Sequence, residues 1–160
     1  LGFKQAQTMM LVFLVNIAAA LGAFVFGYAQ DRAGHKPALA VTLAGWIVMI
    51  VLAWLATTAA LFWVAAVLAG LCMGSSQSAG RAMVGVFAPP THLAEFFGLW
   101  TFATRLSAIV GPVTYGLVTW LSGGDHRLAI LSTALFFIAG LALLKPVNVA
   151  RGVSAARALG

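Results

Sequence analysis

The residues of this chain most able to bind a ligand are polar side chains set within long apolar stretches. Arg105 lies ten residues after Glu95, and on a helix it would share one face with Thr101, Pro112 and Tyr115. An unpaired guanidinium is costly in apolar surroundings, so this face is typical of a cavity wall. There Arg105 could bind an anionic group such as a substrate carboxylate. The alternative is that this helix starts later than predicted and Arg105 reaches the lipid headgroups along its apolar stem.

A second stripe contains Gly70, Gly74, Gln77 and Arg81 at helical spacing. The two glycines would let helices approach closely, which makes helix packing their simplest role. Gln77 and Arg81 form a hydrogen-bonding pair that fits either the lining of a cavity or a gate at its mouth. Glu95, beyond the next prolines, is a candidate partner for Arg81.

The sequence predicts neither a catalytic centre nor a metal site. A serine nucleophile needs a base within hydrogen-bond reach. The three histidines, His35, His92 and His126, lie in polar segments away from Gly74-Ser75-Ser76 and lack the spacing of metal ligands. We expect the single cysteine, Cys72, to act as a small buried hydrophobe. An intramembrane enzyme is therefore the weaker alternative, and no cofactor is expected.

Apolar residues dominate the rest of the chain. Hydrophobic residues make up 62% of the 160 residues, charged residues make up 8%, and the mean hydropathy is +1.04. So few charges cannot cover a soluble domain, which places the chain in a lipid bilayer. The net charge of +6 does not indicate nucleic-acid binding, because the basic residues are scattered between hydrophobic stretches. Asn16 is a lone polar residue that we expect to hydrogen-bond to a neighbouring helix in preference to a substrate.

The apolar stretches are long enough for five membrane-spanning helices, since one span needs about 20 residues. The sequence predicts an all-α membrane protein with spans at about 5–30, 37–56, 60–80, 95–121 and 128–144. We expect Pro37 in the first turn of the second span and a fold-back at Ala56–Thr58. Pro89 and Pro90 should keep the next connector non-helical. Residues 148–160 are expected to form a short, basic and poorly ordered cytoplasmic tail.

The basic residues indicate how the spans are oriented. Counted on alternate sides of the spans, they divide into Arg32, Lys36, Arg81, Lys145, Arg151 and Arg157 on one side and Lys4 and Arg127 on the other. By the positive-inside rule, the side with six basic residues faces the cytoplasm. The N-terminus then faces outward although the chain starts at Leu1 without a signal sequence. We therefore expect a piece of a longer protein.

The segment between the first two spans resembles the signature loop of the major facilitator superfamily. It reads Gly27-x-x-x-Asp31-Arg32-x-Gly34-x-Lys36 and leads into an apolar helix. Residues 77–116 resemble the C-terminal half of the bacterial UMF1 family, relatives of the vacuolar amino-acid effluxer Atg22. The motifs that carry this second resemblance are Gln77-Ser78-Ala79-Gly80-Arg81, Pro89, Glu95-Phe96-Phe97-Gly98-Leu99-Trp100 and Gly111-Pro112-Val113-Thr114-Tyr115-Gly116. Together the two resemblances cover residues 1–147.

The resemblance implies that the spans are the eighth to twelfth helices of a twelve-helix secondary transporter. Five helices of a C-terminal six-helix half are then present, and the N-terminal half and the seventh helix are missing partners in the same chain. The resemblance also implies a multi-pass protein of the bacterial inner membrane that moves a small solute, an amino acid by analogy. One departure is Arg105, where many relatives would carry Lys, which changes the hydrogen-bond geometry.

The resemblance also implies roles for the signature segment. Asp31 would be a conformational latch at the start of a facing helix, within a cytoplasmic gate that includes Gly27, Arg32, Gly34 and Lys36. The alternative for these residues is a solvated turn that only sets topology. For the whole chain, the alternative is a truncated fragment that does not transport, because alternating access needs the pseudo-symmetric partner.

Overall fold

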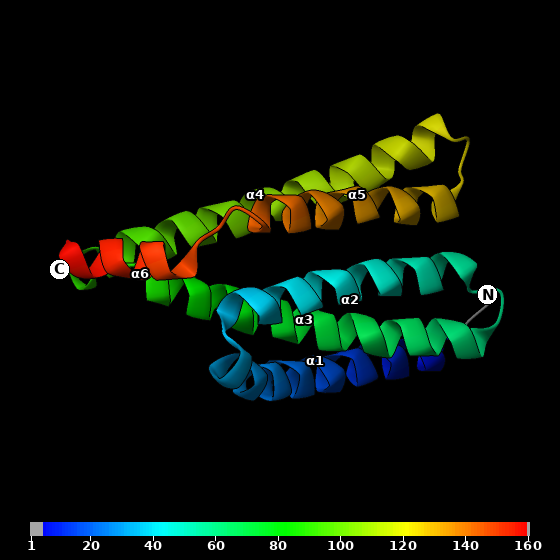
Figure 1. The fold of residues 1–160 in the computed structure, drawn as a ribbon. Helices are drawn as coiled ribbons and strands as arrows, with labels where there is room; N and C mark the ends of the chain where they lie inside the picture. Colours follow the sequence, from blue (N-terminus) through cyan, green and yellow to red (C-terminus); the bar gives the residue numbers. More distant parts are fainter. Residues whose placement is uncertain (1–4, 160) are drawn as a thin grey trace.

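The computed structural model describes residues 5–159 as a bundle of helices (Figure 1), which confirms the predicted all-α class. Residues 1–4 and 160, and Lys4 with them, lie outside the described part. The elements are α1 (Gln5–Ala33), α2 (His35–Leu55), α3 (Ala59–Phe87), the 3-10 turn η1 (Pro90–His92), α4 (Leu93–Leu121), α5 (His126–Leu144) and α6 (Val149–Ala158). Within the described residues, the five helices α1–α5 are long and apolar enough to cross a bilayer.

A single residue, Gly34, separates α1 from α2, so the expected charged loop is wrong. α1 continues to Ala33 and α2 begins at His35. Gly34 has a φ of 91°, a backbone conformation that residues with a Cβ rarely adopt, and it turns the chain in one step. The residues before Gly34 stay helical because no proline interrupts this part of α1. Pro37 lies in the first turn of α2, as predicted.

The connector between α3 and α4 is also shorter than predicted. α3 continues to Phe87 instead of ending near Gly80. A charged residue such as Arg81 does not stop a helix, whereas the following Pro89 and Pro90 do. η1 then leads into α4 two residues earlier than the sequence suggested.

Side-chain caps define the starts of α3 and α5. Thr58 Oγ1 accepts the backbone N–H of Leu61 at 3.4 Å, which confirms the fold-back predicted between the second and third spans. Asp125 Oδ1 accepts the N–H groups of Arg127 and Leu128 at 2.9 and 3.1 Å. Both caps satisfy N–H groups that a helix start leaves without a partner.

The C-terminal residues form helix α6, so the expected poorly ordered tail is wrong. Asn148 caps this helix, since its Oδ1 accepts the backbone N–H of Arg151 at 3.0 Å. α6 packs on the end of α3, where a Cβ added at Gly152 would lie 2.6 Å from the Phe87 ring. Ala156 of α6 is buried. A helix of ten residues is marginal alone in water, so this contact with α3 stabilises it.

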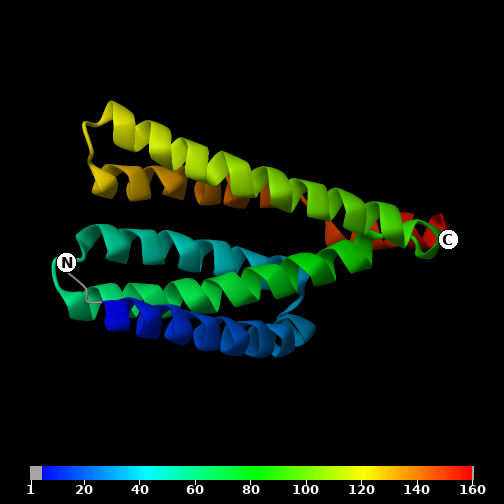
Figure 2. The ribbon, with the colours of Figure 1, turned by 180° about the vertical axis from the view of Figure 1, so that it is seen from behind.

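The elements at the two ends of the bundle differ in charge. One end, hereafter the α6 end, carries Gly34, η1 and α6; the other carries the start of α1 and the α2–α3 and α4–α5 turns (Figures 1 and 2). The basic residues near the α6 end are Arg32, Lys36, Lys145, Arg151 and Arg157, and Arg81 lies in the last third of α3. Among the described residues, Arg127 is the basic residue at the opposite end.

Helices α1 and α3 approach each other closely along small residues. A Cβ at Gly74 would overlap the backbone oxygen of Ala19, and one at Gly70 would overlap the backbone oxygen of Val15. This confirms the predicted packing role of Gly70 and Gly74.

α2 lies between α3 and α5 and contacts both. Towards α3, the buried hydroxyls of Thr42 and Ser75 are 3.3 Å apart. Towards α5, the rings of Trp46 and Phe137 stack with centroids 5.2 Å apart. α4 is different, because it packs along α5, diverges from α3 away from the α6 end (Figure 2) and has no buried residue.

Candidate functional site

A polar pocket of about 520 Å³ lies between α3 and α4 and gathers four of the predicted site residues. We name it the α3–α4 pocket. Its lining consists of Gln77 and Arg81 from α3, and Phe97, Trp100, Thr101, Thr104, Arg105 and Ala108 from α4. Its volume lies within the range of about 300–1,000 Å³ that is usual for sites that bind small molecules.

Helical spacing directs this polar lining towards one space. On α3, Gln77 and Arg81 are one turn apart, and on α4, Thr101 and Arg105 are one turn apart. Because both helices pass this pocket, two stripes that are far apart in the sequence lie opposite each other. The sequence located each stripe but did not place the two together.

Gly80 makes the close approach of α3 and α4 possible. A Cβ at Gly80 would overlap the ring of Trp100, so only the absence of a side chain leaves room for the indole. Gly80 is buried, and it directly precedes Arg81 on α3. The Trp100 ring is therefore held against α3 beside the polar lining of the pocket.

Arg105 lies deep along its helix. It is twelve residues after Leu93, the first residue of α4, which corresponds to a rise of about 18 Å. The headgroup alternative depended on a later start of this helix, and α4 starts earlier than predicted. Within a bilayer, a guanidinium needs a polar or anionic partner.

The α3–α4 pocket carries positive charge. Arg81 and Arg105 contribute two guanidinium groups, and no acidic residue is in the lining. The expected ion pair between Arg81 and Glu95 is not present within residues 5–159, and Glu95 lies exposed in the first turn of α4. At that position a carboxylate interacts favourably with the helix N-terminus instead.

Gln77 and Arg81 are reached from a second side as well. A pocket of about 480 Å³ between α1 and α3 is lined by both residues together with Ala19, Ala23, Met73, Gly74 and Ser78. The polar end of α3 thus borders two pockets. This position is compatible with both roles predicted for Gln77 and Arg81, the lining of a cavity and a gate at its mouth.

Besides Glu95, three predicted candidates lie outside the α3–α4 pocket. The Tyr115 hydroxyl is 3.0 Å from Nδ1 of His126, near the α4–α5 turn. Pro112 lies inside α4 and is exposed. Asn16 is exposed and donates to the Val12 carbonyl of its own helix at 2.8 Å, so the expected interhelical hydrogen bond is wrong.

The signature segment is helical and separate from the pocket lining. Arg32 lies over the Tyr28 ring, with its guanidinium carbon 4.4 Å from the ring centroid, a favourable cation–π geometry. Asp31 is exposed in the last turn of α1. A Cβ at Gly27 would be in ordinary contact with Ser78 of α3, so Gly27 faces a neighbouring helix instead of ending its own.

Lys36 makes a contact that the sequence did not predict. Its Nζ donates to the backbone oxygens of Lys145 and Val147, each at 2.7 Å, at the end of α5. Arg127, at the start of α5, donates to the backbone oxygen of Ala56 at 3.2 Å, at the end of α2. The signal that could have revealed this pairing is that both helices open with a histidine followed by a basic residue.

The serines of α3 are engaged with their own backbone. Ser75 and Ser76 donate to the carbonyl of Cys72 at 3.1 and 2.7 Å, and among the described residues neither hydroxyl bonds to a histidine. Cys72 is a free, buried cysteine, as predicted. The geometry therefore gives no support to the intramembrane enzyme alternative.

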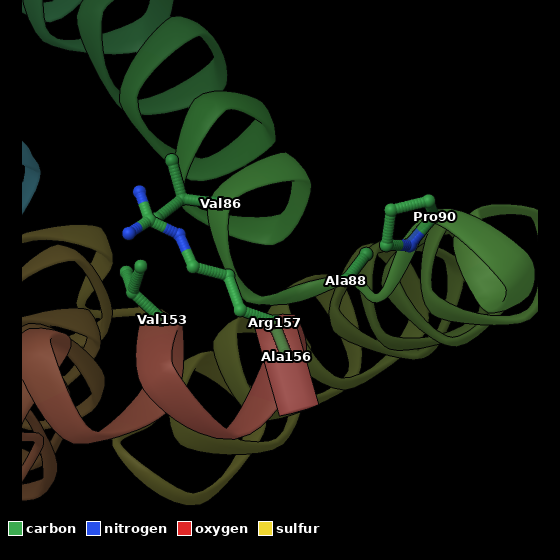
Figure 3. A pocket seen from close by; sticks show the side chains of 6 residues that line it. All are labelled: Val86, Ala88, Pro90, Val153, Ala156 and Arg157. Carbon is green, nitrogen blue, oxygen red and sulfur yellow. The ribbon is translucent and has the colours of Figure 1, made fainter. Parts of the chain in front are cut away.

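A further pocket of about 400 Å³ lies at the α6 end, between the end of α3 and α6. Its lining consists of Val86, Ala88, Pro90, Val153, Ala156 and Arg157. Figure 3 shows the Arg157 side chain reaching from α6 towards Val86. A cation near the end of α3 complements the partial negative charge of the helix terminus.

Comparison with known proteins identifies the family. The family described as "Vacuole effluxer Atg22 like" matches residues 1–157. This chain belongs to the Atg22-like family. The Atg22-like chain is 25% identical to YxiO of Bacillus subtilis, named as an uncharacterized MFS-type transporter, over 90% of the chain and 33% of that protein. The family resemblance noted above, to an Atg22-like member of the major facilitator superfamily, is thereby confirmed.

Two further relatives match the Atg22-like chain over different shares of its length. Autophagy-related protein 22 of Cryptococcus neoformans is 32% identical over 56% of this chain and 16% of its own length. A gallate transporter of Pseudomonas putida is 32% identical over 90% of this chain and 32% of its own length. The Atg22-like chain thus spans about a third or less of these relatives. No solved structure matches it.

Proposed function

We propose that this Atg22-like chain supplies one wall of the central cavity of a secondary transporter. The parent protein moves a small solute across the membrane by alternating access, and this chain contributes its eighth to twelfth helices. The observation that carries the proposal is the α3–α4 pocket, where polar residues from two membrane-spanning helices converge. A cavity lined by polar residues within membrane spans is typical of a substrate pathway.

The partner that this wall requires is the remainder of the parent chain. The Atg22-like chain corresponds to about a third of YxiO and of the gallate transporter. α4 has no buried residue, which is the exposure expected of a helix that another part of the protein covers. The N-terminal half and the seventh helix are the proposed cover.

We further propose an orientation with the α6 end in the cytoplasm of a bacterial cell. Arg32, Lys36, Lys145, Arg151 and Arg157 lie near that end, which agrees with the positive-inside rule. The signature segment, with Asp31 as latch, then faces the cytoplasm, and α6 lies beside it. The membrane that we propose is the bacterial inner membrane.

The proposed role is transport, not catalysis, and the relatives leave two solute classes open. Amino-acid efflux is the activity suggested by analogy with Atg22. One relative is named a gallate transporter, and gallate is an aromatic carboxylate. Both classes carry a carboxylate that Arg105 could bind.

Uptake and efflux by the full-length parent in vesicles would test this function. The solutes are a panel of amino acids and small organic anions, and the variants are Arg105→Ala and Arg151→Ala. Arg151 is an exposed matched control on α6. We expect selective movement that Arg105→Ala abolishes and Arg151→Ala retains, with equal amounts of inserted protein. Movement unaffected by Arg105→Ala would remove Arg105 from the cavity, and movement of no solute would favour the non-transporting alternative.

A further inference from the structure

We infer that the α3–α4 pocket selects an aromatic carboxylate and discriminates against the zwitterion of an amino acid. This inference rests on the proposed transport function and names the solute class for the same site. It follows from three observations: the charge of the lining, the aromatic surface of the lining, and the positions of the acidic residues elsewhere in the chain.

The charge of the lining favours an anion. Arg81 on α3 and Arg105 on α4 both line the pocket, so two guanidinium-bearing side chains border one space from different helices. A guanidinium can donate two parallel hydrogen bonds to a carboxylate, a geometry that an ammonium group does not offer. Thr101 and Thr104 already donate to the carbonyls of Phe97 and Thr101, each at 2.8 Å, so their oxygens accept rather than donate. The donors that the lining side chains offer to a bound carboxylate are therefore the guanidinium groups, the Gln77 amide and the Trp100 indole N–H.

The aromatic surface of the lining favours a ring. Phe97 and Trp100 line the same pocket as the two arginines. Gly80 fixes where the indole lies, because any side chain at that position would overlap it. An aromatic solute gains stacking or edge-to-face contacts with these rings that an aliphatic solute of equal size lacks.

The charged groups of the chain disfavour an ammonium. The three acidic residues all lie elsewhere: Asp31 is exposed at the end of α1, Glu95 is exposed in the first turn of α4, and Asp125 caps α5. An aromatic face can attract an ammonium by a cation–π interaction. Two guanidinium groups beside that face oppose it by like-charge repulsion, which provides specificity against the zwitterion.

Two pairs of matched solutes separate these contributions. 3-Phenylpropionate and phenylalanine share a ring and a carboxylate, and only phenylalanine carries the ammonium. 3-Phenylpropionate and 3-cyclohexylpropionate share the carboxylate, and only the first has an aromatic ring. Each solute would be tested for transport, and as a competitor, with the full-length parent in vesicles.

We expect 3-phenylpropionate to be moved at least about tenfold more efficiently than phenylalanine, equivalent to about 1.4 kcal/mol of discrimination. Arg81→Gln and Arg105→Gln should each reduce this ratio, whereas Arg151→Gln on α6 should not. Trp100→Leu should bring 3-cyclohexylpropionate close to 3-phenylpropionate.

Three outcomes would overturn the inference in different ways. Transport of phenylalanine equal to or better than that of 3-phenylpropionate would overturn the solute class but leave the transport function standing. If no solute of the wider panel moves although the parent is inserted, the transport function fails and the inference with it. A 3-phenylpropionate preference that survives both arginine substitutions would place selection outside this pocket.

Discussion

Lys36 and Arg127 occupy the second position of α2 and α5, and each donates to the carbonyl end of the other's helix. Nζ of Lys36 lies 2.7 Å from the backbone oxygen of Lys145, and Nη2 of Arg127 lies 3.2 Å from that of Ala56. The two helices run in opposite directions, so one cation links them at each end of the pair. Each cation also compensates the partial negative charge at the end of the helix that it contacts.

Removing either cation should loosen one end of the α2–α5 pair. We expect Lys36→Met and Arg127→Met each to destabilise the full-length protein by about 1.5–3 kcal/mol, the range for hydrogen bonds with a charged donor. The effects should be nearly additive because the contacts lie at opposite ends of the helices. Thermal unfolding in detergent would measure them. Lys145→Met is the matched control, since only the backbone of Lys145 takes part; equal destabilisation by this control would contradict the explanation.

The contact between Gly80 and Trp100 should be needed to keep the α3–α4 pocket intact. Gly80→Ala places a methyl group where the indole lies, so we expect lower thermal stability and at least tenfold weaker transport. Gly98→Ala is the control, because no atom lies within 4 Å of a Cβ added there. The double variant Gly80→Ala/Trp100→Leu should recover part of the stability, and its failure to do so would show that the clash lies elsewhere.

The single-residue turn at Gly34 should tolerate few other residues. Its φ of 91° is strained for any residue with a Cβ, so Gly34→Val should destabilise more than Gly34→Asn. We expect at least about 1 kcal/mol for the valine variant. Thermal unfolding of both variants, compared with Gly116→Ala in the open face of α4, would measure the difference. Equal stabilities for the valine and asparagine variants would contradict the assignment of the turn.

The proposed orientation predicts which side of the membrane each turn faces. In full-length protein without other accessible cysteines, Ser154→Cys on α6 should react with a membrane-impermeant maleimide only after cells are opened. Thr57→Cys, at the opposite end, should react in intact cells. Both positions are exposed, whereas the native Cys72 is buried and should stay unlabelled. The reverse labelling pattern would show that the orientation is opposite to the one proposed.

The sequence was most informative where local signals act. Hydrophobic runs predicted five spans, and the Thr58 turn and the small-residue packing of Gly70 and Gly74 followed from short-range rules. The predicted helix ends were wrong where a helix continues past a charged residue, as α3 does at Arg81, because charged residues do not end helices. It also missed α6, whose stability depends on contact with the distant Phe87.

The candidate site was predictable only in parts. Gln77 with Arg81 and Thr101 with Arg105 were each recognised as one face of a helix. Their meeting in one pocket depends on how α3 crosses α4, which no local spacing encodes. The Lys36 contact joins residues 109 positions apart in the chain, so it too required the tertiary structure.

α4 makes fewer buried contacts with the rest of the bundle than α1, α2 and α3 make with one another. α1 packs on α3 through glycine contacts, and α2 is joined to α3 by the buried hydroxyls of Thr42 and Ser75, so relative motion among these three helices would break those contacts. α4 has no buried residue and meets α3 beside the Trp100 contact. Elements with few buried contacts move at the lowest free-energy cost. In the proposed parent, α4 is held by α5 on one side and by the N-terminal half on the other, so movement between the two halves would change the width of the pocket. Spin labels placed across α3 and α4 of the full-length parent would then report a broader distance distribution than labels across α1 and α3.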